Sequence, residues 1–194
     1  MNNNLFLQAV KKIIAGFVAI GVLLFLPAGT FRYWNVWLFV AVLFVPMLFL
    51  GMLMLFKSPK LLEKRLDAKE KIAEQKWVVA LSGIMFIAAF VVAGLNFRYS
   101  WHSLPDYVIW IGASVFLLSY LIYAEVMREN AFLSRTIEVQ ENQKVIDTGL
   151  YGIVRHPMYS ATLIMFLSIP LILGSIISFA IMLAYIPIIA VRMN

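Results

Sequence analysis

The sequence predicts an all-α, polytopic membrane protein with about six transmembrane helices, the last two forming a helical hairpin, and no Rossmann domain. Of the 194 residues, 63% are hydrophobic and 13% are charged, and a soluble domain would carry about twice that charged fraction. Mean hydropathy is +0.90. Several apolar runs approach the ~20 residues that a helix needs to cross a bilayer. The chain has room for several spans and one modest polar site, but not for a separate soluble domain.

Hydrophobic runs place the expected spans along the chain. We expect them at residues 12–27, 35–56, 77–97, 107–127, 158–173 and 175–191. Lys11 and Lys12 before the first run are typical of a secretory signal, but the later spans favour a retained first helix.

The last two runs form one apolar stretch that is too long for a single crossing at ~1.5 Å per residue. Pro170 lacks an N–H group and Gly174 permits a tight reversal, which favours a helical hairpin over one kinked helix.

Basic residues predict the orientation of these spans. With six spans, 14 of the 16 Lys and Arg residues fall on one side, and only Arg32 and Arg98 fall on the other. We therefore expect both termini and the polar segment 142–161 to face the cytoplasm. Topology and attraction to anionic lipid also account for the net charge of +6, so nucleic-acid binding need not be invoked.

Residue types exclude several kinds of site. The chain has no cysteine and two histidines, which excludes disulfides, thiol nucleophiles and a histidine-rich metal cluster. Residues 57–76 have an amphipathic pattern, with Ser58 and Pro59 as a helix start. We interpret this segment as a cytoplasmic connector that touches the interface, and a gate for substrate entry is the alternative.

Polar residues near span ends are functional candidates, because ionisable groups in a bilayer are costly. Glu125 lies in the last turn of the fourth span. Pairing with Arg128 explains a carboxylate at this position nearly as well as a functional role does. Glu129 follows one turn later, and Asn96 lies at the outer end of the third span.

The segment 142–161, NQKVIDTGLYGIVRHPMYSA, is polar and rich in turn residues. Gly149 tolerates a positive φ. Pro157 suits the first turn of the fifth span, where its missing N–H costs nothing. His156 then stands at a helix N-terminus, a favourable place for a carboxylate. Basic and aromatic residues at this position are also typical of plain membrane anchors.

The ordered set SRTIEVQENQKVIDTGLYGIVRHPMYSATL, followed by PLILGS, resembles the isoprenylcysteine carboxyl methyltransferase family of membrane-embedded methyltransferases. The resemblance covers about residues 120–194. It implies N-terminal transmembrane helices over 1–128, which include the connector, and a methyltransferase core over 129–194. It also implies the cofactor S-adenosyl-L-methionine, in agreement with the absence of a G-x-G-x-x-G motif. The cofactor contacts implied by position are Gln143, Lys144, Val145, Ile146, Tyr151, His156, Pro157 and Tyr159.

The same resemblance assigns a positioning role to Arg192, which occupies the position of a family arginine near the end of the last span. In the family an acidic residue of a Glu-Glu pair follows four residues later, whereas this sequence ends at Asn194. We expect either a fragment of a longer chain or a protein that lacks this acidic element and is less active.

The implied reaction is carboxyl O-methylation of a lipid-like or prenylated acceptor that enters from the bilayer, without a metal. A carboxylate is already ionised and needs no base, so we expect His156 to bind cofactor rather than move protons. Two alternatives remain open: a membrane reductase of related architecture with a nicotinamide cofactor, and a non-catalytic scaffold or ligand sensor. A phospholipid amine or a small isoprenoid acid is an alternative acceptor.

Overall fold

The structure is a computed structural model that describes residues 3–66, 73–130 and 148–193. Within this part of the chain the regular elements are all helices, and the β-pairing is confined to an isolated bridge between Ser103 and Ser175. Among the described residues, four helices are long and apolar enough to cross a membrane: α1 (Asn3–Ala28), α2 (Trp34–Lys57), α4 (Ala73–Tyr99) and α5 (Asp106–Glu129). The predicted all-α membrane fold is confirmed.

Helix α1 begins before the predicted start at residue 12, because Lys11 and Lys12 continue the helix rather than precede it. Lysine is a good helix former and its long stem lets the ammonium reach water. The Lys12 ammonium donates a hydrogen bond to the carbonyl of Leu66 at the end of α3 (Pro59–Leu66). This contact ties the start of the chain to the connector between the second and third spans.

Helix α3 occupies the first half of the predicted connector 57–76, and residues 67–72 lie outside the described residues. Pro59 opens the helix, and the Ser58 carbonyl accepts backbone N–H groups from Leu61 and Leu62 at 3.0 and 3.2 Å. Leu62 is buried, whereas Lys60 and Glu63 are exposed. An apolar face toward the bundle and a charged face toward water are what the amphipathic pattern predicts.

The predicted hairpin is confirmed, with its reversal at Gly174. Helix α6 (Pro157–Ile172) runs through Pro170 and ends two residues later. Gly174 has a φ of +70°, and its N–H bonds to the Leu171 carbonyl at 3.0 Å. Glycine adopts this left-handed conformation without the steric cost that a Cβ would add.

The predicted run at 175–191 corresponds to the shorter apolar helix Ile176–Val191, which is divided internally into α7 (Ile176–Met182) and α8 (Tyr185–Met193). Pro187 explains the division. It has no N–H to donate to the carbonyl of Leu183, and its ring crowds that carbonyl. The Leu183 carbonyl instead accepts the N–H of Ile186 at 3.1 Å, in a tighter turn.

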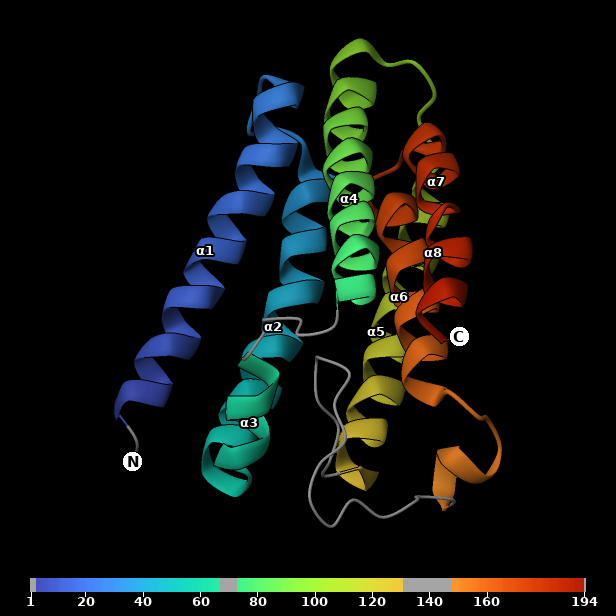
Figure 1. Ribbon diagram of the computed structural model, residues 1–194. Helices are drawn as coiled ribbons and strands as arrows, with labels where there is room; N and C mark the ends of the chain where they lie inside the picture. The colour runs from blue at the N-terminus through green and yellow to red at the C-terminus, as the bar shows by residue number, and fades with distance from the viewer. Residues whose placement is uncertain (1–2, 67–72, 131–147, 194) are drawn as a thin grey trace.

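The bundle has two distinct ends (Figure 1). The N-terminus, α3 and the short helix η1 (Gly149–Gly152) lie at one end, which we call the open end. The α1–α2 turn, the α4–α5 connection and the α6–α7 turn lie at the opposite end, which we call the closed end. Helix α5 packs along α6, and α1 packs along α4. Buried side chains between these helices form one core, which includes Leu24, Val36, Phe39, Ala89, Ala93, Phe116, Ile172, Leu173 and Met182.

Buried polar groups join the turns of the closed end. Tyr33 is 1% exposed and its hydroxyl donates to the Leu173 carbonyl, while the Asn35 amide donates to the Ile172 carbonyl at 3.0 Å. Burial raises the pKa of Tyr33. The Asn96 side chain exchanges two hydrogen bonds with the backbone of His102, at 3.1 and 3.2 Å.

Candidate functional site

Helix η1 rests on the end of α5 through the carboxylate of Glu129. Leu150 N–H donates to Glu129 Oε2 at 3.1 Å. Gly149 has a φ of +54°, and a Cβ placed on it would lie 1.5 Å from Glu129 Oε1. The carboxylate therefore occupies the space that a side chain at position 149 would fill. The predicted turn at Gly149 is confirmed, and glycine is needed there both for its conformation and for this contact.

Tyr151 is held from the same end of α5 by the next residue along the helix. The Asn130 side-chain amide donates to the Tyr151 hydroxyl at 3.0 Å, and both side chains are half-buried. The two neighbouring residues at the end of the fourth span thus fix two successive parts of η1. The sequence singled out Glu129 as a polar residue at a span end but gave it no role, and Asn130 gave no signal.

The start of α6 agrees with the sequence prediction. Pro157 is buried at the first helical position, where its missing N–H leaves no bond unmade. His156 precedes it, exposed to solvent, and its carbonyl accepts the N–H of Ser160 at 3.1 Å. The His156 and Tyr159 rings lie 6.0 Å apart. An aromatic surface thus forms at a helix N-terminus, which carries partial positive charge.

Tyr159 also lines a cavity of about 630 Å³ that extends between the helices. The cavity is mainly apolar, and its hydroxyl-bearing lining residues come from several helices. They are Tyr120 and Tyr123 of α5, Tyr159 and Thr162 of α6, Tyr185 of α8 and Ser82 of α4. This volume lies within the ~300–1,000 Å³ typical of small-molecule sites, and an apolar wall with a few polar groups is typical of them.

Arg65 of α3 gives this cavity its charge. Its guanidinium lies over the Tyr123 ring, 5.2 Å from the ring centroid, at the distance of a cation–π contact. Among the described residues that line the cavity, Arg65 is the charged one, and none is acidic. The cavity is therefore suited to an amphiphile with an apolar body and an end group that is anionic or that contacts aromatic rings. The sequence did not find it, because Arg65 and the tyrosines are far apart along the chain.

The predicted site residues differ in how much the structure says of them. Tyr151, His156, Pro157 and Tyr159 lie along one continuous segment, η1 to the first turn of α6, at the open end. Of the predicted site residues whose side chains are described, Tyr159 lines the cavity. Gln143, Lys144, Val145 and Ile146 lie outside the described residues.

The backbone of Arg192 belongs to α8, which packs against α4 and α6, and its side chain lies outside the described ones. In the described part of the chain no three His, Asp or Glu residues gather as metal ligands.

The chain was compared with known protein families. Residues 107–194, from the start of α5 onward, match the model of the phospholipid methyltransferase family. No curated protein and no solved structure matches the chain. The matched region contains η1, the His156–Tyr159 pair and the hairpin. Together with the apolar helices, the match indicates a membrane-embedded methyltransferase that acts on lipid-like substrates.

Proposed function

We propose that this protein transfers a methyl group from S-adenosylmethionine to the carboxylate of an isoprenylcysteine-type acceptor held in the membrane. The family match supports methyl transfer to a lipid-like molecule. The observation that supports the finer assignment is the cavity at Tyr159. It combines an apolar wall, several tyrosines and the positive charge of Arg65, as a prenyl chain that ends in a carboxylate would require.

The residues at the start of α6 have the chemistry to hold the cofactor. When bound, S-adenosylmethionine supplies an electrophilic methyl group on a positively charged sulfur. The faces of Tyr151 and Tyr159 attract such a cation, and the His156 ring extends the aromatic surface beside Tyr159. The backbone at the start of α6 favours a carboxylate. Gln143–Ile146 and Arg192 remain predicted contacts on the strength of the resemblance.

The contribution of the chain to the reaction is positioning. Glu129 and Asn130 hold η1 against the end of α5. The position of Tyr151 is therefore set by the fourth span. The apolar wall of the cavity excludes water and holds the acceptor tail. Correct placement of two reactants can lower a barrier by up to ~7–11 kcal/mol. Because a carboxylate is already ionised, no residue has to remove a proton.

Charge favours a carboxylate over a phospholipid amine as the acceptor. An amine is an ammonium ion at neutral pH and must lose a proton before it can accept a methyl group. Beside Arg65 it would meet a like charge, and no acidic residue lines the described part of the cavity. A carboxylate meets an opposite charge there and forms its strongest hydrogen bonds with a guanidinium.

Cofactor binding is tested with the purified chain in neutral detergent by calorimetry. We expect binding of S-adenosylmethionine and none of a reduced nicotinamide dinucleotide. His156→Ala and Tyr151→Ala should each weaken binding by about 1–3 kcal/mol, the cost of a hydrogen bond that becomes buried when the cofactor covers it. His102→Ala and Tyr107→Ala are matched controls, because both residues are exposed and belong to the α4–α5 connection and the start of α5, which lie at the closed end (Figure 1). Unchanged affinity in both test variants, with helix content intact, would contradict the site.

The acceptor is tested with a labelled methyl group and two lipid-like substrates, an S-prenylated N-acetylcysteine and phosphatidylethanolamine. A carboxyl methyl ester releases labelled methanol in mild base, whereas an N-methyl group stays on the lipid. We expect base-labile product from the prenylcysteine only. Base-stable product from phosphatidylethanolamine would retain methyl transfer but overturn the carboxylate assignment.

A further inference from the structure

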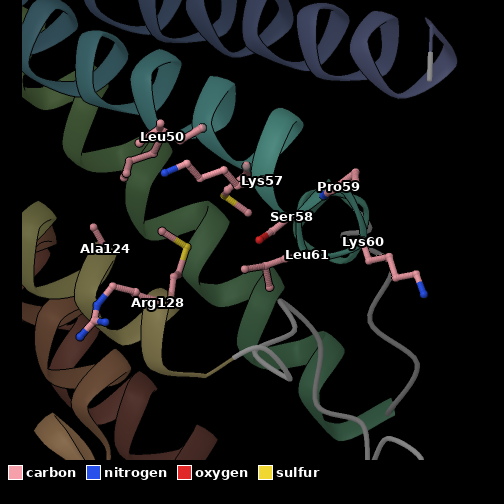
Figure 2. Close-up of a pocket in the computed structure, with 11 residues that line it drawn as sticks. Leu50, Lys57, Ser58, Pro59, Lys60, Leu61, Ala124 and Arg128 are labelled. Carbon is pink, nitrogen blue, oxygen red and sulfur yellow. The ribbon is translucent and has the colours of Figure 1, made fainter. Parts of the chain in front are cut away.

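A second cavity, of about 720 Å³, lies at the open end between α2, α3 and α5 (Figure 2). As far as the described residues go, it shares no lining residue with the cavity at Tyr159. Its apolar wall comes mainly from the last turns of two spans, with Leu50, Leu53 and Met54 on α2 and Ala124 and Met127 on α5. An apolar recess of this size, open at its edge, can accept hydrocarbon chain.

The rim of this cavity is basic. Figure 2 shows the Lys57 side chain extending across the cavity toward Leu50 and Ala124, with its ammonium on the cavity side. The Ser58 hydroxyl lies near Leu61, and Arg128 lines the cavity from α5 with its guanidinium turned away from Ser58. Lys60, although it contributes to the lining, directs its ammonium away from the other labelled residues. Lys57 and Ser58 thus provide the polar groups at the mouth of the recess.

The positive charge at this place comes from Lys57. Arg128 forms a two-point contact with Glu125, at 2.6 and 2.8 Å, which offsets its charge. Within the described residues, the structure gives Lys57 no carboxylate partner. An exposed ammonium beside an apolar recess favours a ligand that provides both an anion and a hydrocarbon chain.

The depth of the cavity identifies the kind of ligand. Lys57 is the last residue of the second apolar span, and Arg128 is one residue from the end of the fourth. The ends of apolar spans are expected at the level of the lipid headgroups, so an acyl chain would run along the apolar wall. We propose that this cavity binds an anionic glycerophospholipid, with its phosphate beside Lys57 and Ser58 and an acyl chain along Leu50, Leu53 and Met127. This site is independent of the proposed methyl transfer.

The experiment titrates the purified full chain, in neutral detergent, with phosphatidylglycerol and with phosphatidylcholine of identical acyl chains, and native mass spectrometry counts bound lipid. We expect one phosphatidylglycerol to bind roughly tenfold more tightly than phosphatidylcholine, as the loss of one charge-assisted contact implies. Lys57→Gln should remove this preference. Lys60→Gln removes the same charge from a side chain that points away, and should keep affinity within roughly twofold of the unchanged protein.

Two further arms distinguish a lipid site from a bare phosphate site and from general charge attraction. Ala124→Phe fills the recess and should weaken both lipids, whereas glycerol 3-phosphate, which has no acyl chain, should not compete. Equal losses of phosphatidylglycerol affinity in Lys57→Gln and Lys60→Gln would show only general attraction by a basic surface. That result would overturn the proposal. Equal binding of the two lipids, or competition by glycerol 3-phosphate, would also overturn it. Circular dichroism of each variant confirms that the helices are retained.

Discussion

At the closed end of the bundle, Tyr33, Asn35 and Asn96 are at most 5% exposed and bond to backbone groups of other elements. At the open end, Glu129 and Tyr151 are only half-buried, His156 is exposed, and two cavities remain between the helices. A buried polar group contributes to stability only while its partner is in place. The closed end therefore stabilises the fold, whereas the open end leaves space between its helices.

Single cysteines would test whether these two ends face opposite sides of a membrane, and the expected effect is all-or-none. The chain has no native cysteine. Ser58→Cys and Thr148→Cys lie at the open end, and Ser103→Cys lies at the closed end, all exposed. A membrane-impermeant thiol reagent should label the first two from one side and the third from the other, with the open end cytoplasmic. Labelling of Ser58→Cys and Thr148→Cys from different sides would contradict the arrangement.

Gly94→Ala should cause the largest loss of stability. A Cβ at this position would lie 2.7 Å from the Leu24 carbonyl oxygen and 2.9 Å from Pro27 of α1. The backbone of a helix cannot move aside as a side chain can. We therefore expect a loss of about 3 kcal/mol in the free energy of unfolding, which is the upper end of the range for overpacked cores. Denaturant unfolding in mixed micelles measures it. Gly51→Ala is the matched control, because nothing lies within 4 Å of its added Cβ.

The pair Tyr33→Phe and Tyr151→Phe compares the two ends directly, because each substitution removes one hydroxyl. Tyr33→Phe removes the donor to the Leu173 carbonyl and should lower the free energy of unfolding by about 1–2 kcal/mol. Cofactor binding should not change. Tyr151→Phe should cost less than about 0.5 kcal/mol of stability at its half-buried site. It keeps the ring but removes the hydroxyl that Asn130 holds in place, so cofactor binding should weaken. A larger loss of stability in Tyr151→Phe than in Tyr33→Phe, with weaker cofactor binding only in Tyr33→Phe, would assign the structural role to the open end.

Gly149→Ala should uncouple η1 from α5 at a modest cost in stability. The left-handed conformation costs an alanine about 1 kcal/mol, and the added Cβ forces the Glu129 carboxylate to shift. Because Glu129 is a flexible side chain, we expect the fold to persist while S-adenosylmethionine binds more weakly. Glu129→Gln, which keeps the shape and the acceptor oxygen for Leu150 N–H, should retain more affinity. A larger loss in Glu129→Gln than in Gly149→Ala would contradict this account.

Arg192→Lys is expected to have the smallest effect on the fold. A lysine anchors the end of a helix as well as an arginine does, so the free energy of unfolding should stay within about 0.5 kcal/mol. A lysine does not reproduce the planar, two-point contact of a guanidinium with a carboxylate, so cofactor or acceptor affinity should fall about tenfold. Arg98→Lys, at the closed end, is the control. Unchanged binding in Arg192→Lys would leave Arg192 as an anchor only.

The sequence by itself determined the features that depend on neighbouring residues. Hydrophobic runs located the four long helices, Pro157 located the start of α6, and Gly174 located the reversal of the hairpin. Each of these follows from local chemistry: the cost of polar groups in lipid, the missing N–H of proline and the missing Cβ of glycine. The break before α8 was missed although Pro187 is visible, because a short proline-interrupted run is compatible with either a kink or two helices.

Only the tertiary structure decided how distant polar residues meet. Glu129 fits against Gly149, Asn130 holds Tyr151, and Tyr33 reaches Leu173 across 140 positions of sequence. The two cavities arise in the same way, because their walls combine side chains from three or more helices. Hydrophobic periodicity indicates which face of a helix avoids water. In lipid, however, the hydrophobic effect does not favour one apolar neighbour of a helix over another. Their packing, and with it the site, is set by the fit of side chains that lie far apart along the chain.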